Sequence, residues 1–490
     1  MPKWTDPFDP RRLGDWSFGT GPMYGRLAQS LEAAIDTGQL PAGTRLPPER
    51  PLAEALAVSR TTVVLAYRRL RSTGLVESRQ GSGTFVARGS FPRSRRALRE
   101  DTSRSFLVDS VTRAAAEEPA GTISFMGACL PAADDLLLEA WAAAQSDVRG
   151  LGGHAGYSPQ GLPSLRQTIA TWFGRRGLPT TPDEVLVTGG AQQAIDLVAR
   201  LFTTSGASVV LEDPTYLGAI DAFALARTRL LSLPVGPTGA DVDALRRLVT
   251  EEAPALCYLV PTFHNPTGTV LPESGRRAVA RLAEDTGTTI LEDESLAELS
   301  FGSEPPPPIA AFAPRAPVLT VGSISKLFWG GLRVGWIRGP RPLIARLTRL
   351  KVTADLSGSV VSQALAIRVL PHRDEIAQRR RRESLARLDH LATLLHERLP
   401  EWSFIRPEGG LTLWVRLPVA AAEELARAGV RHGVSIVPGA VHSPSGACRD
   451  HVRLPFVLDA GQLREGVDRL ARAWDACRGL EGEKRLGVIV

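Results

Sequence analysis

The chain has 490 residues, of which 43% are apolar and 22% are charged. These values are typical of globular proteins and exclude a mainly disordered chain, and the length indicates roughly two to four domains. No stretch approaches about 18 consecutive apolar residues, which argues against a membrane span. The polar start MPKWTDPFDPRR lacks the form of a signal peptide. We therefore expect a cytoplasmic protein with reduced thiols and no metal site, because no metal-ligand spacing links Cys129, Cys257, Cys448 and Cys477.

The charge is distributed unevenly along the chain. Residues 1–113 contain 18 basic and 11 acidic residues, and the remainder contains 40 basic and 41 acidic residues. A basic N-terminal quarter is expected of a nucleic-acid-binding module joined to a near-neutral domain. Only four of the 58 basic residues are lysines, at positions 3, 326, 351 and 484. A lysine within a Gly/Ser-rich motif is therefore a candidate for amine chemistry, which arginine cannot perform.

Residues 22–88 are expected to form a compact domain. Apolar residues recur at helical spacing from Met23 to Ile35, a short helix is expected at about 51–57, and another helix opens at Ser59 as its N-cap. The stretch LVESRQGSGTFVAR predicts two short strands joined by a glycine-containing turn. This order of elements predicts a winged helix-turn-helix.

The first turn of a recognition helix reads base edges, and a wing reaches phosphate or the minor groove. The candidate DNA contacts are therefore Arg50, Ser59, Arg60, Thr61, Thr62, Arg79, Gln80 and Gly81. The alternative is a charged surface helix without a ligand. With its LPPER and VSRTTV motifs, the stretch from GQLPAG to SGTFV resembles the GntR-type bacterial regulator domain. This resemblance implies binding to double-stranded operator DNA.

Two segments around this domain show little hydrophobic periodicity. Residues 1–21 are interpreted as an N-terminal extension. Residues 89–120 are Arg/Ser-rich and are interpreted as a linker. A solvated helix over 106–118 is the alternative for part of that linker.

The pattern of apolar and polar residues changes at about residue 121. Apolar strand-like runs such as EVLVTGG, SVVLED and PVLTVGS alternate with helical stretches, which predicts an α/β domain with a largely parallel sheet over 121–369. Residues 370–480 are expected to form a smaller C-terminal α+β subdomain, and residues 481–490 a tail. Functional loops should follow the carboxyl ends of the parallel strands.

One of these loops contains a candidate reactive amine. In VGSISKLFWGGLRVGW, Lys326 follows an apolar strand, with Ser323 before it and Arg333 seven residues after it. An amine that forms a Schiff base needs a partly desolvated pocket, and a ligand phosphate needs an arginine and hydroxyl groups. The alternative is a surface-loop lysine, which the rarity of lysine in this chain disfavours.

Other strand ends offer the groups that a pyridoxal phosphate (PLP) ring requires. Asp293 could keep the pyridine nitrogen protonated, Asn265 could hydrogen-bond the phenolic oxygen, and Tyr216 could stack on the ring. A glycine-rich loop that enters a helix could direct backbone amides at an anion, from Gly190, Ala191 and Gln192. Each motif alone is common, since such an Asp is often a cap and Asn-Pro is often a turn. Their combination predicts a PLP site.

Taken in order, these motifs resemble the fold type I aminotransferases over about residues 121–475. The resemblance implies that Lys326 is the Schiff-base lysine, that Asp293 pairs with the pyridinium, and that Asn265 and Tyr216 contact the ring. It also assigns the phosphate to Ala191, Gln192, Ser323 and Arg333.

The same resemblance bears on the effector and on turnover. It implies that Arg453, in HVRLPF, binds a substrate α-carboxylate; a surface arginine on a strand is the alternative. The family usually has a tyrosine shortly after the aspartate, helping to bind the phenolic oxygen, and the corresponding residue here is Ser295. The substitution removes a group that tunes the imine and weakens the expectation of efficient turnover, but not that of PLP binding.

The whole chain resembles the MocR/GabR-type transcriptional regulators, in which a GntR-type winged helix is linked to an aminotransferase-like domain. This implies a head-to-tail homodimer in which a small-molecule amine or amino-acid effector, or PLP itself, alters operator binding. Use of the aminotransferase-like domain as a sensor is expected, and whether it is also an enzyme stays open. The alternatives are an active PLP-dependent aminotransferase with a secondary DNA-binding head, and a DNA-binding protein with a cofactor-free scaffold.

Overall fold

The computed structural model describes residues 23–36, 40, 43–56, 58–72, 76–79, 83–86, 121–132, 134–150, 153, 155–302 and 304–486. The chain divides into two compact units, Met1–Arg99 and Glu100–Val490. The expected N-terminal extension, the linker, Gln80 and Gly81 lie outside the described residues. Within those residues, no helix is long and apolar enough to cross a membrane.

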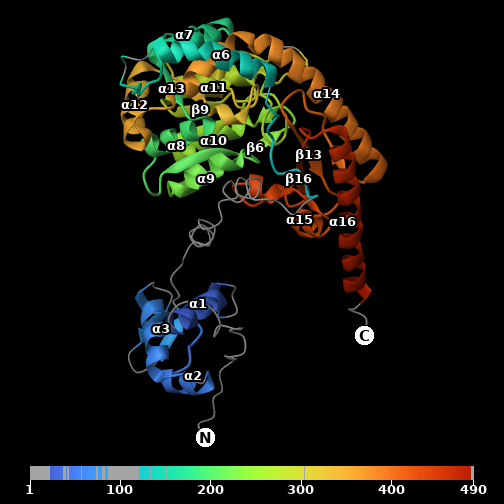
Figure 1. Ribbon diagram of the computed structural model, residues 1–490. Coiled ribbons are helices and arrows are strands. Elements are labelled where there is room, and N and C mark those ends of the chain that lie inside the picture. The colour runs from blue at the N-terminus through green and yellow to red at the C-terminus, as the bar shows by residue number, and fades with distance from the viewer. Residues whose placement is uncertain are drawn as a thin grey trace. The chain divides into compact units, whose positions relative to one another are not determined.

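The first unit is a three-helix domain with a β-hairpin (Figure 1). Its elements are α1 (Met23–Asp36), α2 (Glu49–Ala55), α3 (Arg60–Ser72), β1 (Val76–Arg79) and β2 (Gly83–Val86). The helices share one apolar core that includes Leu31, Leu52 and Tyr67. The hydroxyl of Tyr67 donates to the carbonyl of Pro47 at 2.8 Å, which satisfies the one polar group of this buried side chain. The predicted winged helix-turn-helix is confirmed.

The second unit is built on an eight-stranded sheet. In spatial order its strands are β4 (Val185–Thr188), β11 (Gly335–Arg338), β10 (Val318–Ser323), β9 (Thr289–Asp293), β8 (Leu256–Leu259), β5 (Ser208–Asp213), β6 (Arg229–Gly236) and β7 (Gly239–Ala240). All are parallel except β11 and β7, which run antiparallel to their neighbours. The carboxyl ends of the parallel strands therefore share one edge.

Helices cover both faces of this sheet (Figure 1). One face packs against α8 (Ala191–Phe202), α9 (Leu217–Leu225) and α12 (Arg341–Asp355). The other packs against α7 (Pro163–Arg175), α10 (Val242–Glu252), α11 (Glu273–Thr286) and α13 (Val360–Val369), with α6 (Asp134–Gly150) on α13. Neighbouring strand residues alternate between the two cores, as Leu186 and Val187 do. Short 3₁₀ helices lie at Pro182–Glu184, Ile309–Phe312, Gly330–Leu332, Leu370–His372 and Gly439–His442.

A smaller α+β subdomain completes the second unit. A four-stranded sheet has the order β12 (Ser403–Phe404), β13 (Thr412–Arg416), β16 (His451–Pro455) and β15 (Val437–Pro438). Its helices are α14 (Arg373–Arg398), which spans from one subdomain to the other (Figure 1), α15 (Ala422–Arg431) and α16 (Ala460–Leu486). The expected fold class, a largely parallel α/β sheet with a smaller α+β subdomain, is confirmed.

Two boundaries differ from those expected. The strand β3 (Ile123–Ser124) pairs with β14 (Val434–Ser435), and Phe125 enters the core of the small subdomain. The segment that follows the linker thus packs with residues far along the chain, a long-range contact that local periodicity does not encode. The helix α16 continues to Leu486, into the segment expected to be a tail.

Candidate cofactor and effector site

The predicted cofactor residues gather where the parallel strands end. Asp293 closes β9 and Ser323 closes β10, and the start of β11 at Gly335 lies between β10 and β4. A Cβ atom on Gly335 would lie 2.8 Å from the Cα of Gly190. Glycine at this position therefore allows the loop after β4 to come close to the start of β11.

The loop before α8 forms an anion-binding arrangement with Arg333. Gly190 is the N-cap of α8, with φ of 116°, a conformation that favours glycine. Arg333 Nη2 donates to the carbonyl of Gly189 at 2.6 Å, so the guanidinium lies beside this loop. The hydroxyl of Ser323 donates to the carbonyl of Val334 at 3.3 Å, next to the start of β11. A helix N-terminus, an arginine and a hydroxyl group together suit a phosphate.

Gln192 and Tyr216 both lie next to Gly218. Gln192 Nε2 donates to the carbonyl of Gly218 at 2.8 Å, while its Oε1 is buried without a partner. A Cβ atom on Gly218 would lie 2.6 Å from the ring of Tyr216. Burial and the nearby carboxylate of Asp293 raise the pKa of the Tyr216 phenol above its ordinary value. Tyr216 is therefore a neutral aromatic side chain beside Asp293.

Lys326 is half-buried, three residues after the end of β10. Its Nζ donates to the carbonyl of Ala128 at 2.9 Å and lies 3.5 Å from Cys129 Sγ. The sequence did not identify Cys129, because its proximity depends on a contact across almost 200 positions of the chain.

Asp293 is buried and its carboxylate is held on both oxygens. Oδ1 accepts from the backbone N–H of Ser295 at 2.9 Å, and Oδ2 accepts from the hydroxyl of Tyr258 at 2.9 Å. Burial raises the pKa of Asp293, and these hydrogen bonds oppose that rise. Tyr258 was missed at the sequence level. The available signal was a phenol inside the buried run LCYL, because such a hydroxyl requires a partner.

Arg453 is 5% exposed, so the alternative of a surface strand arginine is wrong. It lies on β16, between Trp414 of β13 and Val437 of β15. Its Nη2 donates to the carbonyl of Met126, and its Nε has no hydrogen-bond partner. Burial lowers the pKa of Arg453 to about 10, which still leaves it charged at neutral pH. A buried cation of this kind requires an anionic partner.

Unpaired polar atoms provide a test of whether this site fits PLP and an amino acid. Asn265 Oδ1, Gln192 Oε1 and Arg453 Nε are all buried without partners. Native proteins satisfy most buried polar groups, so these atoms are open to a polar ligand: the guanidinium N–H to an anion, and the two amide oxygens to a donor. The amide group suits the ring of PLP, the anion-binding loop suits its phosphate, and the amine suits its aldehyde. The buried guanidinium suits the carboxylate of an amino acid. The residues present fit this cofactor.

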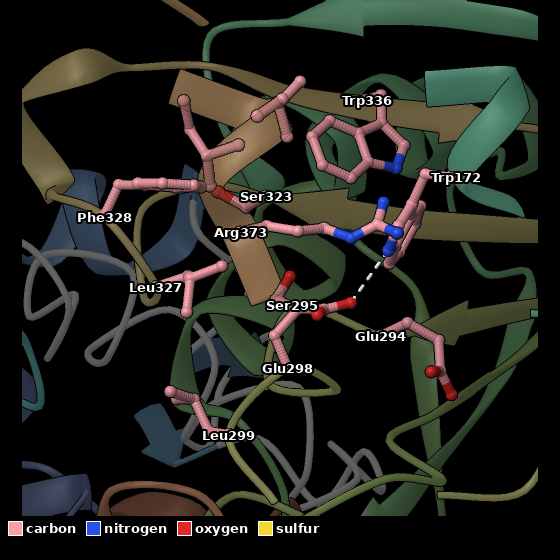
Figure 2. A pocket seen from close by; sticks show the side chains of 12 residues that line it. Trp172, Glu294, Ser295, Glu298, Leu299, Ser323, Leu327, Phe328, Trp336 and Arg373 are labelled. Carbon is pink, nitrogen blue, oxygen red and sulfur yellow. Dashed lines mark hydrogen bonds between the residues drawn. The ribbon is translucent and has the colours of Figure 1, made fainter. Parts of the chain in front are cut away.

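Ser295 lines a small cavity next to the cofactor residues. Figure 2 shows it with Trp172, Glu298 and Trp336 around a cavity of about 20 Å³, large enough for about one water molecule. Trp172 Nε1 donates to Glu298 Oε1 at 2.8 Å. The backbone N–H of Ser295 donates to Asp293 Oδ1 at 2.9 Å, and the Ser295 hydroxyl also lies close enough to lower the pKa of Asp293. In the described residues, this hydroxyl makes no hydrogen bond to Lys326 or Asn265.

In the first unit, the recognition-helix candidates lie together at the start of α3. Ser59 Oγ accepts the N–H of Thr62 at 3.1 Å, as an N-cap does, and lies 2.8 Å from its hydroxyl. Thr61 is exposed, and Arg60 is exposed and pairs with Glu49 at 3.1 Å. Exposed pairs of this kind contribute little, so Arg60 can exchange Glu49 for a phosphate or a base.

Three further positions surround this helix. Arg50 is exposed on α2, and the backbone of Arg79 ends β1. Arg45 was missed at the sequence level. It is exposed at the base of the hairpin, with Nε 3.0 Å from the Cβ position of Gly83. Its backbone bridges to Phe85 of β2, a pairing with the wing that no local pattern indicated.

Comparison with known proteins agrees with both units. The family profile "Aminotransferase class I and II" matches residues 127–470, and the profile "Bacterial regulatory proteins, gntR family" matches residues 23–86. The chain is 35% identical to the 2-aminoadipate transaminase of Thermus thermophilus over 363 residues, 72% of this chain and 90% of that protein.

A regulator and a solved structure extend this comparison. The probable rhizopine catabolism regulatory protein MocR of Rhizobium meliloti is 29% identical over 478 residues, 92% of this chain and 94% of that protein. The crystal structure of LysN, the α-aminoadipate aminotransferase of Thermus thermophilus complexed with N-(5'-phosphopyridoxyl)-L-leucine, has a TM-score of 0.70 and 33% identity. That match covers 78% of this chain and 98% of LysN.

Fold and site together define a PLP-binding domain of the aminotransferase type, joined to a DNA-binding winged helix. The chain belongs to the class I and II aminotransferase family, and with its GntR domain it has the MocR-type architecture. It is a PLP-dependent transcriptional regulator that binds DNA through the winged helix. Its aminotransferase fold accommodates an amino-compound ligand.

Proposed function

We propose that Lys326 supplies the amine that attaches PLP, and that an amino-acid effector bound beside it changes the affinity of the winged helix for operator DNA. The observation that supports this best is that Lys326, Asp293 and Asn265 all lie at or after the carboxyl ends of neighbouring strands. When bound, PLP supplies an electron-withdrawing ring whose aldehyde carbon condenses with amines.

The residues of the chain divide the work of holding the cofactor. The first-turn amides of α8, with Arg333 and Ser323, hold the phosphate. The face of Tyr216 would stack on the ring, and the amide of Asn265 would donate to the phenolic oxygen. Asp293 would keep a proton on the ring nitrogen. Burial raises the pKa of this carboxyl, and the hydrogen bonds from Ser295 and Tyr258 oppose that rise.

Arg453 selects the effector. Its unpaired Nε and its burial favour a carboxylate, and an effector amine must reach Lys326. An amino acid satisfies both requirements. Relatives support this class, since one is named a 2-aminoadipate transaminase and another is complexed with a phosphopyridoxyl-leucine. In the alternative in which PLP itself is the signal, Arg453 has no effector to bind.

The regulator acts as a homodimer in this proposal. Large apolar side chains are exposed on α6, at Leu138 and Trp141, and on the loop after Lys326, at Trp329. A second copy would cover these side chains. The head-to-tail arrangement remains a prediction. The shift in DNA affinity cannot exceed the difference in effector affinity between the two states of the dimer.

The absorbance of the purified protein tests the attachment of PLP. Wild type should absorb near the band of lysine-bound PLP, and Lys326→Ala should lose this band. Lys326→Arg is the matched control for charge, and it should lose the band too because arginine cannot form the bond. An unchanged spectrum in both variants would contradict the assignment.

DNA binding provides the second test. Fluorescence anisotropy with the DNA upstream of the regulator's own gene is measured while PLP, amino acids and simple amines are added in turn. An amino acid should shift the affinity only when PLP is present. A response to PLP alone would favour PLP as the signal, and no response to any of them would contradict the sensor.

A working aminotransferase is the second candidate function, since 35% identity to a transaminase accompanies an intact set of Lys326, Asp293 and Asn265. A screen of amino donors against keto acids separates the two. Turnover above about 1 per second, a common enzyme value, would favour the enzyme. Half-reactions without sustained turnover would favour the sensor.

A further inference from the structure

Lys351 is buried on α12, which is unusual for a lysine. Its Nζ donates to Asp355 Oδ1 at 2.8 Å, one turn further along the helix. A buried ammonium costs free energy unless it is paired and hydrogen-bonded. The cofactor chemistry described above makes no use of Lys351, and most cations elsewhere in this chain are arginines.

The pair continues as a chain of hydrogen bonds towards the phosphate loop. Asp355 Oδ2 accepts from Gln193 Nε2 at 2.8 Å. Gln193 Oε1 in turn accepts from the backbone N–H of Gly189 at 2.7 Å. Because Gln193 lies in the first turn of α8, its side chain reaches back to the residue before the N-cap Gly190. Three consecutive hydrogen bonds therefore connect Lys351 to the loop.

The charge on Asp355 sets the orientation of the Gln193 amide. A carboxylate accepts only, so it selects the NH₂ end of the amide and turns Oε1 towards Gly189. A flipped amide would place two donors against each other at Gly189. Lys351 in turn holds the carboxylate in place. Asp355 is about a quarter exposed, so without the ammonium it is free to turn towards solvent and release Gln193.

The loop is thereby fixed from two sides. Gln193 accepts the N–H of Gly189, and Arg333 donates to its carbonyl. The residue Gly189 precedes the first-turn amides of α8, whose direction it helps to set. Arginine would suit the position of Lys351 poorly, because a buried guanidinium has five donors to satisfy.

We propose that Lys351 is a positioning residue for the phosphate of PLP, acting through Asp355 and Gln193 on the Gly189–Gly190 loop. The inference rests on the proposed function, because it requires PLP to bind at this loop. It gives a second lysine of this chain a role in cofactor binding.

Lys351→Met, which keeps most of the length of the side chain and removes its charge, tests this role. The Kd values of PLP and of pyridoxal, which lacks the phosphate, are measured from the absorbance of the lysine-bound species. The Kd of PLP should rise about 5- to 30-fold, as expected for the loss of a charge-assisted hydrogen bond. The Kd of pyridoxal should change little, so the preference for the phosphate falls by the same factor.

Gln193→Leu should reduce this preference to a similar degree. Its effect should not add to that of Lys351→Met, because both act through one chain of contacts. Asp355→Asn, which keeps the shape of the side chain, should reduce the preference as well and serves if Lys351→Met does not fold.

Arg338→Met is the matched control, because Arg338 is also a buried cation but lies at the far end of β11 from Gly335. It pairs with Glu184 at 3.8 Å, and its Nε donates to the hydroxyl of Thr180, away from the phosphate loop. Its preference for PLP over pyridoxal should equal that of wild type. Equal weakening of PLP and pyridoxal by Lys351→Met, or an unchanged preference, would overturn the positioning role. A wild type that binds neither compound would instead overturn the proposed function.

Discussion

At the scale of single residues, Arg453 gives the clearest prediction of which effectors bind. It is buried, it remains charged at neutral pH, and its Nε lacks a partner. Arg453→Met should therefore raise the Kd of carboxylated effectors about 10- to 100-fold, as expected for a buried charge-assisted hydrogen bond. PLP absorbance should stay near the wild-type value.

Effector titrations monitored through the cofactor absorbance check this expectation. An amine without a carboxylate is the control ligand, because its Kd should be the same in both proteins. A parallel loss of both ligands would show that Arg453 supports the fold rather than the carboxylate.

The second residue-scale prediction concerns Cys129, which is exposed and lies 3.5 Å from Lys326 Nζ. Burial raises the pKa of Cys257 to about 12 and that of Cys448 to about 11, which suppresses their thiolates. Iodoacetamide should therefore label Cys129 before these two, and PLP should slow the labelling by occupying the space beside Lys326. Peptide mass spectrometry after short exposures checks the order. Equal labelling with and without PLP would place Cys129 outside the cofactor site.

The sequence predicted the site residues that directly follow a strand. Asp293 and Lys326 were identified because apolar runs locate the strand ends, and parallel strands bring those ends to one edge. Tyr258 and Cys129 were not identified, because their roles depend on contacts between distant segments. Ser295 illustrates the same limit: its position after Asp293 was visible, but the cavity that it lines with Trp172 and Trp336 was not.

At the scale of elements, the N-terminus of α3 links stability to DNA binding. Ser59 accepts the N–H of Thr62 there, and loss of such a cap costs about 1 kcal/mol. Ser59→Ala should therefore speed hydrogen exchange in the first turn of α3 and weaken DNA binding through fraying. Thr61→Ala is the control, because Thr61 is exposed: exchange should stay unchanged while DNA affinity falls. Unchanged exchange in Ser59→Ala would contradict the capping role.

Among the elements, those with strong periodicity were predicted best. The helix from Met23 and the helix after Ser59 lie where their apolar residues placed them. The short apolar run at 434–438 is divided between β14 and β15, which pair with different partners. Such a division follows from which neighbouring strand is available, and the sequence of the run itself does not contain that information.

At the scale of the whole molecule, His442 predicts how stability depends on pH. It is buried, its Nδ1 lies 3.0 Å from the carbonyl of Thr215, and its Nε2 has no partner. Burial and the charge of Arg453 lower its pKa well below 6.5. The folded state thus keeps His442 neutral while the unfolded chain takes up a proton as pH falls below about 6.5. This residue therefore makes unfolding easier towards acid pH.

Thermal unfolding of wild type and His442→Asn between pH 8 and pH 5 measures this effect. The variant should lose less stability over this interval, because position 442 no longer titrates. Identical pH profiles would show that His442 does not contribute to acid sensitivity.

The exposed apolar surface of α6 predicts the oligomeric state. Leu138 is 70% exposed and Trp141 is 52% exposed, one helical turn apart, and Trp329 near Lys326 is 42% exposed. Burying side chains of this size in an interface is favourable, whereas a charge placed among them must be desolvated without a partner. Light scattering should therefore give the mass of a dimer for wild type and a monomer for Trp141→Glu at the same concentration.

Val430→Glu, a substitution at a similarly exposed apolar residue on α15, is the control and should remain a dimer. Because a dimer engages two half-sites at once, the monomer should also bind operator DNA more weakly. A Trp141→Glu protein that stays dimeric would place the interface elsewhere on the chain.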